Sequence, residues 1–157
     1  MAERPPGYEL PLLLFGAFRS IVDATHADLA ERGHPDLRPI HGFVFQAIGV
    51  RGTTAVELAA RLAVSKQAAG KTIANLEKQG YVERTASPTD ARAKIVRLTV
   101  RGVEFLELSA RAFDEIQTEW AEAIGEQRLT ELRSDLRRFA PGELFRLDAP
   151  GWLGSER

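Results

Sequence analysis

Apolar residues recur at three- and four-residue intervals in six stretches of the chain, which is the spacing of an amphipathic helix. Glycine, proline or a short polar turn separates each stretch from the next. The pattern therefore predicts helices over residues 11–32, 36–49, 54–62, 66–79, 99–124 and 126–139. Two segments between the fourth and fifth helices, 81–85 and 94–98, alternate with period two and predict an antiparallel strand pair with a long polar tip.

Residues with capping chemistry stand at several predicted helix ends. Thr53 or Thr54 suits the N-cap of the third helix, with Glu57 three residues after Thr54 as a capping box, and Ser65 is a strong N-cap for the fourth helix. Gly33 and Gly80 suit C-terminal caps, because glycine adopts the left-handed conformation without strain. The third and fourth helices are thus short and joined by a tight turn, which is typical of a helix-turn-helix.

Each predicted helix has an apolar face that we expect to be buried. The first helix is apolar on more than one side, which favours a subunit interface. The expected inward residues of the other helices are, in chain order, Ile40, Phe43, Val44, Ala47 and Ile48; Val56, Leu58, Ala59 and Leu62; Ala69, Ile73 and Leu76; Phe105, Leu108, Ala112, Ile116 and Trp120; and Leu129, Leu132, Leu136 and Phe139.

Composition and charge narrow the class of protein. The 157 residues suffice for one domain, with or without an added oligomerisation element. The chain has no cysteine, which excludes disulfides, thiolate zinc sites and thiol-based redox sensing. No membrane span or secretion signal is recognisable, so we expect a cytoplasmic protein.

Residues 51–101 hold ten Lys or Arg against four Asp or Glu, although the whole chain has a net charge of −1. This basic centre indicates a surface for a polyanion.

The outer face of the fourth helix carries side chains suited to the major groove of DNA. Residues near the N-terminus of such a helix reach base edges, which here means Ser65, Lys66, Gln67 and Lys71. Glutamine has the donor and acceptor that adenine requires, and lysine donates to guanine. Asn75 lies on the same face, and Gly70 permits close approach of the DNA backbone or of the preceding helix.

The polar tip of the predicted hairpin offers a second contact. Arg92 is suited to the minor groove, where arginine favours narrow A·T tracts, and Asp90 is suited to orienting an arginine. Lys94 and Arg84 are candidates for phosphate contacts. Each charge alone is as readily a solvated surface residue, so the prediction depends on the coincidence of cap, turn, polar face, hairpin and basic excess.

Several of these segments together resemble the multiple-antibiotic-resistance-regulator (MarR) family. They are Glu57-Leu58-Ala59, Val64-Ser65-Lys66-Gln67, Leu76-Glu77, Gly80-Tyr81-Val82-Glu83-Arg84, Pro88-Thr89-Asp90-Ala91-Arg92 and Leu98-Thr99-Val100-Arg101-Gly102. The resemblance implies a homodimeric winged-helix regulator, commonly a repressor, that binds a pseudopalindrome and responds to a small, often aromatic, effector. It also implies that Asp90 and Arg92 form the wing pair and that Ser65, Gln67, Ala68 and Lys71 lie on the recognition face.

Other kinds of site have weaker support. An effector pocket would draw on His26, His41, Phe45 and Trp120, although such residues are more often core or interface. The three histidines fit no metal-ligand spacing, so we expect no metal and no cofactor. The chain contains no Gly-x-Ser-x-Gly, Walker loop or His-Glu-x-x-His, and we expect no enzyme activity.

The predicted fold class is mainly α with a small β-wing, a winged helix-turn-helix with N- and C-terminal dimerisation helices. We expect residues 35–99 to form the DNA-binding lobe, 1–34 and 100–140 the dimerisation region, and 141–157 a C-terminal tail. The partners expected are double-stranded DNA, a second copy of the chain and a small effector, with no membrane. The alternative is a winged-helix protein-interaction module without DNA binding, which the near-neutral whole-chain charge leaves open.

Overall fold

Six helices and three short strands follow one another in the computed structural model, which describes residues 5–88 and 93–140. In chain order they are α1 (Glu9–Glu31), α2 (Pro39–Ile48), β1 (Thr53–Thr54), α3 (Ala55–Leu62), α4 (Lys66–Lys78), β2 (Val82–Ala86), β3 (Lys94–Leu98), α5 (Val100–Ile124) and α6 (Glu126–Phe139). All six predicted helices and both predicted strands are present, so the mainly helical class with a small β-wing is confirmed.

Helix α2 starts three residues later than the apolar pattern suggested. Pro39 is its first residue, and Arg38 before it is extended, with φ −98° and ψ 158°. Proline disfavours the helical region for the residue that precedes it, so the helix cannot extend back to Asp36. The Nδ1 atom of His41 accepts a hydrogen bond from the Arg38 backbone N–H at 3.1 Å and caps this end.

The strands form one antiparallel sheet in the order β1-β3-β2. Arg84 lies opposite Val96 and Ala86 lies opposite Lys94. Strand β1 was not predicted, because two residues are too few to show an alternating pattern. It pairs Thr53 with Val96 and so joins the start of α3 to the wing.

The core lies where α2, α3 and α4 meet the sheet and the first turns of α5. Phe45, Tyr81 and Phe105 form its aromatic centre, with ring centroids 5.2 Å apart between Phe45 and Phe105 and 5.7 Å apart between Phe45 and Tyr81. Around them pack the buried aliphatic side chains Leu29, Val44, Ile48, Leu58, Leu62, Ile73, Leu76, Val82 and Val96. Val56 was predicted to point inward but is 57% exposed.

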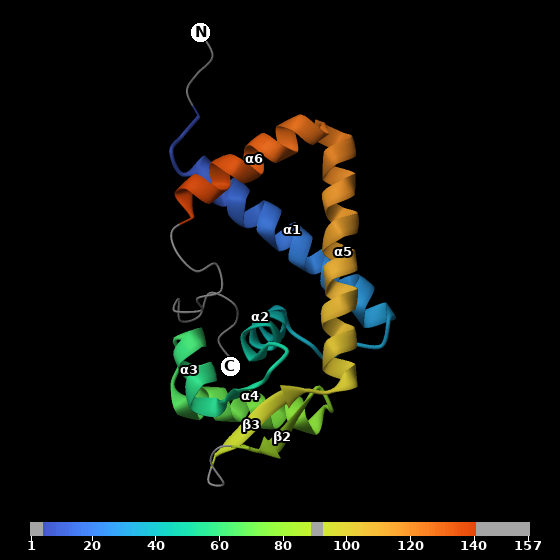
Figure 1. The fold of residues 1–157 in the computed structure, drawn as a ribbon. Coiled ribbons are helices and arrows are strands. Elements are labelled where there is room, and N and C mark those ends of the chain that lie inside the picture. The colour runs from blue at the N-terminus through green and yellow to red at the C-terminus, as the bar shows by residue number, and fades with distance from the viewer. Residues whose placement is uncertain (1–4, 89–92, 141–157) are drawn as a thin grey trace.

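The elements divide into two parts, which Figure 1 shows one above the other. We call α1, α5 and α6 the frame, and α2, β1, α3, α4, β2 and β3 the winged lobe. Helix α5 runs from the end of β3 upwards, and α6 leads from its upper end back towards α1 (Figure 1). A sharp break at Gly125, with φ +93°, allows that turn.

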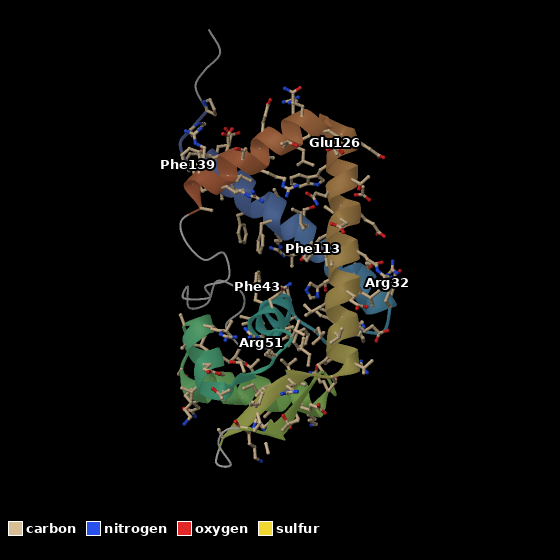
Figure 2. The ribbon with its side chains drawn as sticks, viewed as in Figure 1. Arg32, Phe43, Arg51, Phe113, Glu126 and Phe139 are labelled. Atoms are coloured by element: carbon tan, nitrogen blue, oxygen red, sulfur yellow. The ribbon has the colours of Figure 1, made fainter. Side chains whose placement is uncertain are left out.

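Much of the frame's apolar surface is uncovered in the single chain. Of the α6 residues predicted to be buried, only Leu129 is; Leu132 and Leu136 are exposed, and Phe139, labelled at the end of α6 in Figure 2, is 81% exposed. On α1 the exposed apolar side chains are Leu10, Leu12, Leu13, Leu14, Phe15 and Phe18. No helix in the described ranges is both long enough and apolar enough to cross a membrane.

Candidate nucleic-acid interface

The helix-turn-helix is built by one left-handed residue and two side-chain caps. Ala63, with φ +53°, ends α3, and the backbone N–H of Val64 donates to the carbonyl of Ala59 at 3.0 Å. The hydroxyl of Ser65 then accepts a hydrogen bond from the Ala68 backbone N–H at 3.1 Å and starts α4. At the other end of α3, Thr54 and Glu57 form the predicted capping box. The Glu57 carboxylate accepts hydrogen bonds from the Thr54 backbone N–H and from the Thr53 and Thr54 hydroxyls. These bonds lower the pKa of Glu57, and the one from the Thr54 backbone has the largest effect.

Helix α4 buries one face and exposes the other, as the sequence predicted. Ala69, Ile73 and Leu76 are buried against the core. The α4 residues proposed to read DNA, and the residue that caps the helix, are all exposed: Ser65, Lys66, Gln67, Ala68, Lys71 and Asn75. Gln67, Lys71 and Asn75 are four residues apart and so follow one another along one side of the helix, which allows them to meet one groove together.

Gly70 lies at the edge of this face in open space. A Cβ atom built on it would meet nothing within 4 Å apart from the helix itself. The structure therefore gives no support to the idea that Gly70 allows α3 to approach closely, and close approach of DNA remains a prediction.

The wing is attached to α4 by an ion pair that the sequence did not reveal. The Arg84 Nη1 atom lies 2.7 Å from the Glu77 Oε2 atom, with both side chains about one-third exposed. Arg84 is thus engaged with α4 rather than directed only to solvent. Lys94 is exposed on the neighbouring strand, opposite Ala86. Asp90 and Arg92, the proposed wing pair, lie outside the described residues.

Three contacts fix the end of α4, the wing and the start of α5 to one another. The Thr99 hydroxyl donates to the Gly80 carbonyl at 2.6 Å, and the Thr99 backbone N–H donates to the Tyr81 carbonyl at 3.0 Å. Gly102 packs so closely on that same carbonyl oxygen that any side chain there would collide with it. The orientation of α4 is therefore set by the base of α5 as well as by the core.

A cavity of about 240 Å³ lies between the frame and the winged lobe. Its walls come from α1, α2 and α5, and Phe43 of α2 and Phe113 of α5, labelled in Figure 2, are among them. The other side chains that line it are Phe18, Ile21, Val22, Thr25, His26, Leu29, Pro39, Gly42, Gln46, Phe105, Leu106 and Ser109. No lysine or arginine is among them, so the cavity is apolar with a few neutral polar groups.

Only one of the four residues proposed for an effector pocket lines this cavity. His26 does, and burial lowers its pKa despite a backbone hydrogen bond at Leu37 and the nearby Asp23. His41 and Phe45 are buried in the core instead, and burial lowers the pKa of His41 to about 4. Trp120 lines a second cavity, of about 300 Å³, between α5 and α6.

Thr25 is one of three polar residues of this cavity, with Gln46 and Ser109, that the sequence did not predict. It is buried, and its hydroxyl has no hydrogen-bond partner in the described part of the chain. The signal was present, because Thr25 lies four residues from both Ile21 and Leu29 on the apolar stripe of α1. A buried hydroxyl without a partner costs free energy, which a ligand with a polar group would recover.

No group of three or more His, Cys, Asp or Glu side chains that could hold a metal ion occurs among the residues that the structure describes.

Comparison with known structures places this geometry among winged-helix proteins. FabT from Streptococcus pneumoniae in complex with DNA matches with a TM-score of 0.71 at 18% identity, over 85% of this chain and 94% of that one. MarR from E. coli in its apo form matches with a TM-score of 0.63 at 23% identity, over 88% and 100%. A MepR variant from Staphylococcus aureus bound to an oligodeoxyribonucleotide matches with a TM-score of 0.63 at 18% identity, over 87% and 96%. At such identities these likenesses show a common fold.

Sequence comparison adds a family match over part of the chain. The model of the MarR family matches residues 36–93, which include α2, the helix-turn-helix and β2. No curated protein is significantly similar in sequence. The fold defines a winged helix-turn-helix protein with helical extensions at both ends. Residues 36–93 are thus similar to the MarR family, within a fold that the solved structures share over most of the chain.

Proposed function

We propose that the chain is a homodimeric transcriptional repressor that binds a pseudopalindromic DNA operator and is released by a small aromatic effector. The observation that carries the proposal is the exposed polar face of α4, capped by Ser65 and flanked by the wing, in a fold shared with DNA-bound FabT and MepR. The protein has no catalytic role in this scheme, and a regulator must reach the chromosome, which implies a cytoplasmic protein.

The α4 face supplies both kinds of contact that DNA recognition needs. Gln67 and Lys71 would read base edges, while the first backbone N–H groups of α4 and the Ser65 hydroxyl would meet a phosphate. Lys94 would reach the phosphates beside the wing. Because phosphate contacts release counterions, affinity would fall steeply with salt.

The frame supports a second copy of the chain as the partner. The apolar side chains of α1 and α6 make an uncovered surface of a kind that single soluble chains rarely present. In a two-fold dimer the two α4 helices would enter successive major grooves, about 34 Å apart. We therefore propose residues 1–34 and 100–140 as the dimerisation region and 35–99 as the DNA-binding lobe.

The cavity between frame and lobe supports an aromatic effector without a negative charge. Four phenylalanines line it (Phe18, Phe43, Phe105 and Phe113), no cation does, and His26 is neutral at pH 7 because its pKa is lowered. A ligand wedged there would alter the distance between the two α4 helices and so reduce the fit to one turn of DNA.

The test is a gel shift with DNA from upstream of the gene that encodes the chain, at several salt concentrations. We expect a shift whose midpoint moves to higher protein concentration as salt rises, and a shift by random duplex only at much higher protein concentration. Light scattering on the same sample should give the mass of a dimer.

Two controls separate the alternatives. Lys66→Glu with Lys71→Glu reverses charge only on the exposed α4 face and should abolish the shift while leaving the dimer intact. A wild-type protein that is dimeric but shifts neither duplex at any salt concentration would favour the protein-interaction module instead.

A further inference from the structure

A polar cluster with two buried members and one exposed member joins the frame to the winged lobe at the base of α5. His34, in the loop after α1, has its Nδ1 atom 2.8 Å from the phenolic oxygen of Tyr81, the residue that precedes β2. Arg101, in the first turn of α5, donates through Nη2 to the same oxygen at 3.2 Å and to the Gly33 carbonyl at 3.1 Å. We call His34, Tyr81 and Arg101 the lobe–frame joint.

The joint is packed as well as hydrogen-bonded. His34 and Tyr81 are almost fully buried, and their ring centroids lie 5.6 Å apart. The guanidinium of Arg101 covers the Tyr81 ring at 4.7 Å from its centroid. The ring of Phe105, which also lines the cavity between frame and lobe, stands edge-on to His34 at 5.6 Å. Three separate segments of the chain thus meet at one histidine.

The hydrogen bonds define which nitrogen of His34 carries the proton. The guanidinium of Arg101 can only donate, so the Tyr81 oxygen is the acceptor in that hydrogen bond. The phenolic proton of Tyr81 is then free to be donated to His34. Nδ1 must then be the acceptor, and the proton of the neutral ring is on Nε2. The opposite tautomer would leave the phenolic proton without an acceptor in a buried site.

Protonation of His34 would break this arrangement. Nδ1 would become a donor, and the Tyr81 oxygen would face two donors with its own proton unplaced. Nε2 has no hydrogen-bond partner among the described residues, and the exposed carboxylate of Glu104 lies 3.9 Å away. Burial lowers the pKa of His34; Glu104 opposes this shift and Arg101 adds to it. These two side chains and the Tyr81 phenol are the charged or titratable groups that face the ring in the described ranges.

We propose that neutral His34, protonated on Nε2, holds the winged lobe in its DNA-binding orientation and that protonation of His34 releases it. This inference rests on the proposed function, since it concerns how the α4 face is positioned. His34 is a positioning residue: it touches no DNA and acts through Tyr81, whose backbone carbonyl fixes Thr99 and Gly102. Acid would therefore weaken DNA binding without any change on the DNA-contacting face.

The first test reads His34 without DNA. Nitrogen-15 NMR of the histidine rings in the full chain, assigned with His34→Gln, should show Nδ1 unprotonated and Nε2 protonated at about pH 8. Tyr81→Phe removes the phenolic proton, and the tautomer preference should be lost. Protonation on Nδ1 in the wild type would overturn the inference.

The second test measures DNA affinity against pH on the upstream DNA fragment. Below the pKa of His34, wild-type affinity should fall by about tenfold per protomer for each pH unit. His34→Gln, which cannot take up a proton, should bind with little pH dependence. Glu104→Gln, on an exposed residue, should move the fall to lower pH, because it removes the charge that favours the imidazolium.

The outcomes separate this inference from the proposed function. Binding whose pH dependence is the same in wild type and His34→Gln would overturn the inference alone. Absence of DNA binding at every pH would overturn the proposed function and the role of His34 in it. Circular dichroism at each pH shows whether a variant is folded. If His34→Gln does not fold, the shift in the pH dependence of DNA affinity between wild type and Glu104→Gln tests the role of His34 instead.

Discussion

Arg84 of strand β2 and Glu77 of helix α4 form an ion pair, with 2.7 Å between Nη1 and Oε2, that couples the wing to the proposed recognition helix. Both side chains are partly exposed, so the pair contributes less than about 1 kcal/mol to stability. It also limits how far Arg84 can neutralise a phosphate. We expect Glu77→Gln to strengthen binding to random DNA and to steepen its salt dependence, because Arg84 gains freedom and a negative charge is removed.

The measurement is the slope of log affinity against log salt for wild type and Glu77→Gln on the same random duplex. Arg84→Gln serves as the matched change on the other partner and should weaken binding. An unchanged slope in Glu77→Gln would show that Arg84 does not contact phosphate even when it is free to do so.

Gly70 is a second position where stability and DNA binding should separate. Its surroundings are empty and its backbone is helical, so Gly70→Ala should stabilise the protein by up to about 1 kcal/mol. If the DNA backbone approaches α4 here, the same change should weaken operator binding. Gly102→Ala is the contrasting variant: its methyl group would collide with the Tyr81 carbonyl, so it should destabilise the fold. A Gly70→Ala protein less stable than wild type in urea would contradict the structure.

The turn of the helix-turn-helix holds an alanine where glycine is less strained. Ala63 has φ +53°, a conformation that costs an L-residue about 1 kcal/mol. We expect Ala63→Gly to be neutral or stabilising by up to about 1 kcal/mol, despite the greater freedom of the unfolded chain. Ala60→Gly, on the exposed side of the regular part of α3, should destabilise by about that amount. Urea unfolding of the two variants would give the comparison; equal losses would show that Ala63 is not strained.

The sequence predicted what depends on local chemistry. The caps at Thr54 and Ser65 and the buried stripe of α4 follow from residues a few positions apart, and all are found. What depends on distant segments was missed. Phe45 was predicted to line a pocket because its burial depends on Tyr81 and Phe105, far away in the chain. His41 was predicted to do the same and is also buried.

The frame shows the same limit in another form. The apolar spacing of α6 predicted burial, yet one chain alone leaves Leu132, Leu136 and Phe139 exposed. Periodicity reports that a face is apolar and not which surface covers it. The sequence also does not predict the Arg84–Glu77 pair or the lobe–frame joint. Their members are too far apart in the chain for any local spacing to connect them.

Gln67 and Lys94 should differ in how they affect DNA binding. A glutamine that pairs with a base edge specifies sequence, so Gln67→Ala should cost about 1–3 kcal/mol on the operator and little on random DNA. A lysine on phosphate carries no sequence information, so Lys94→Ala should weaken both duplexes alike and reduce the salt slope by about one. Titrations of each variant on both duplexes measure the ratio of operator affinity to random-DNA affinity directly. Equal losses on the two duplexes for both variants would count against these roles.

The stability of the fold should decrease in mild acid because its two buried histidines and the half-buried His26 are neutral. Burial lowers the pKa of His26, His34 and His41 below their ordinary value of 6.5, in the case of His41 to about 4. The unfolded chain therefore binds more protons than the folded one in this range. The resulting stability is fully present above pH 6.5 and is lost as the pH falls towards about 4, with His41 contributing on the order of 3 kcal/mol.

Urea unfolding between about pH 7 and 5, above the range where carboxylates titrate, should show a steady decrease in the free energy of unfolding. His41→Gln should lower the stability at neutral pH, because it disturbs the Arg38 cap, yet reduce the slope with pH. A stability that does not change across this range would mean that the histidines are protonated without cost, which their burial in this fold does not allow.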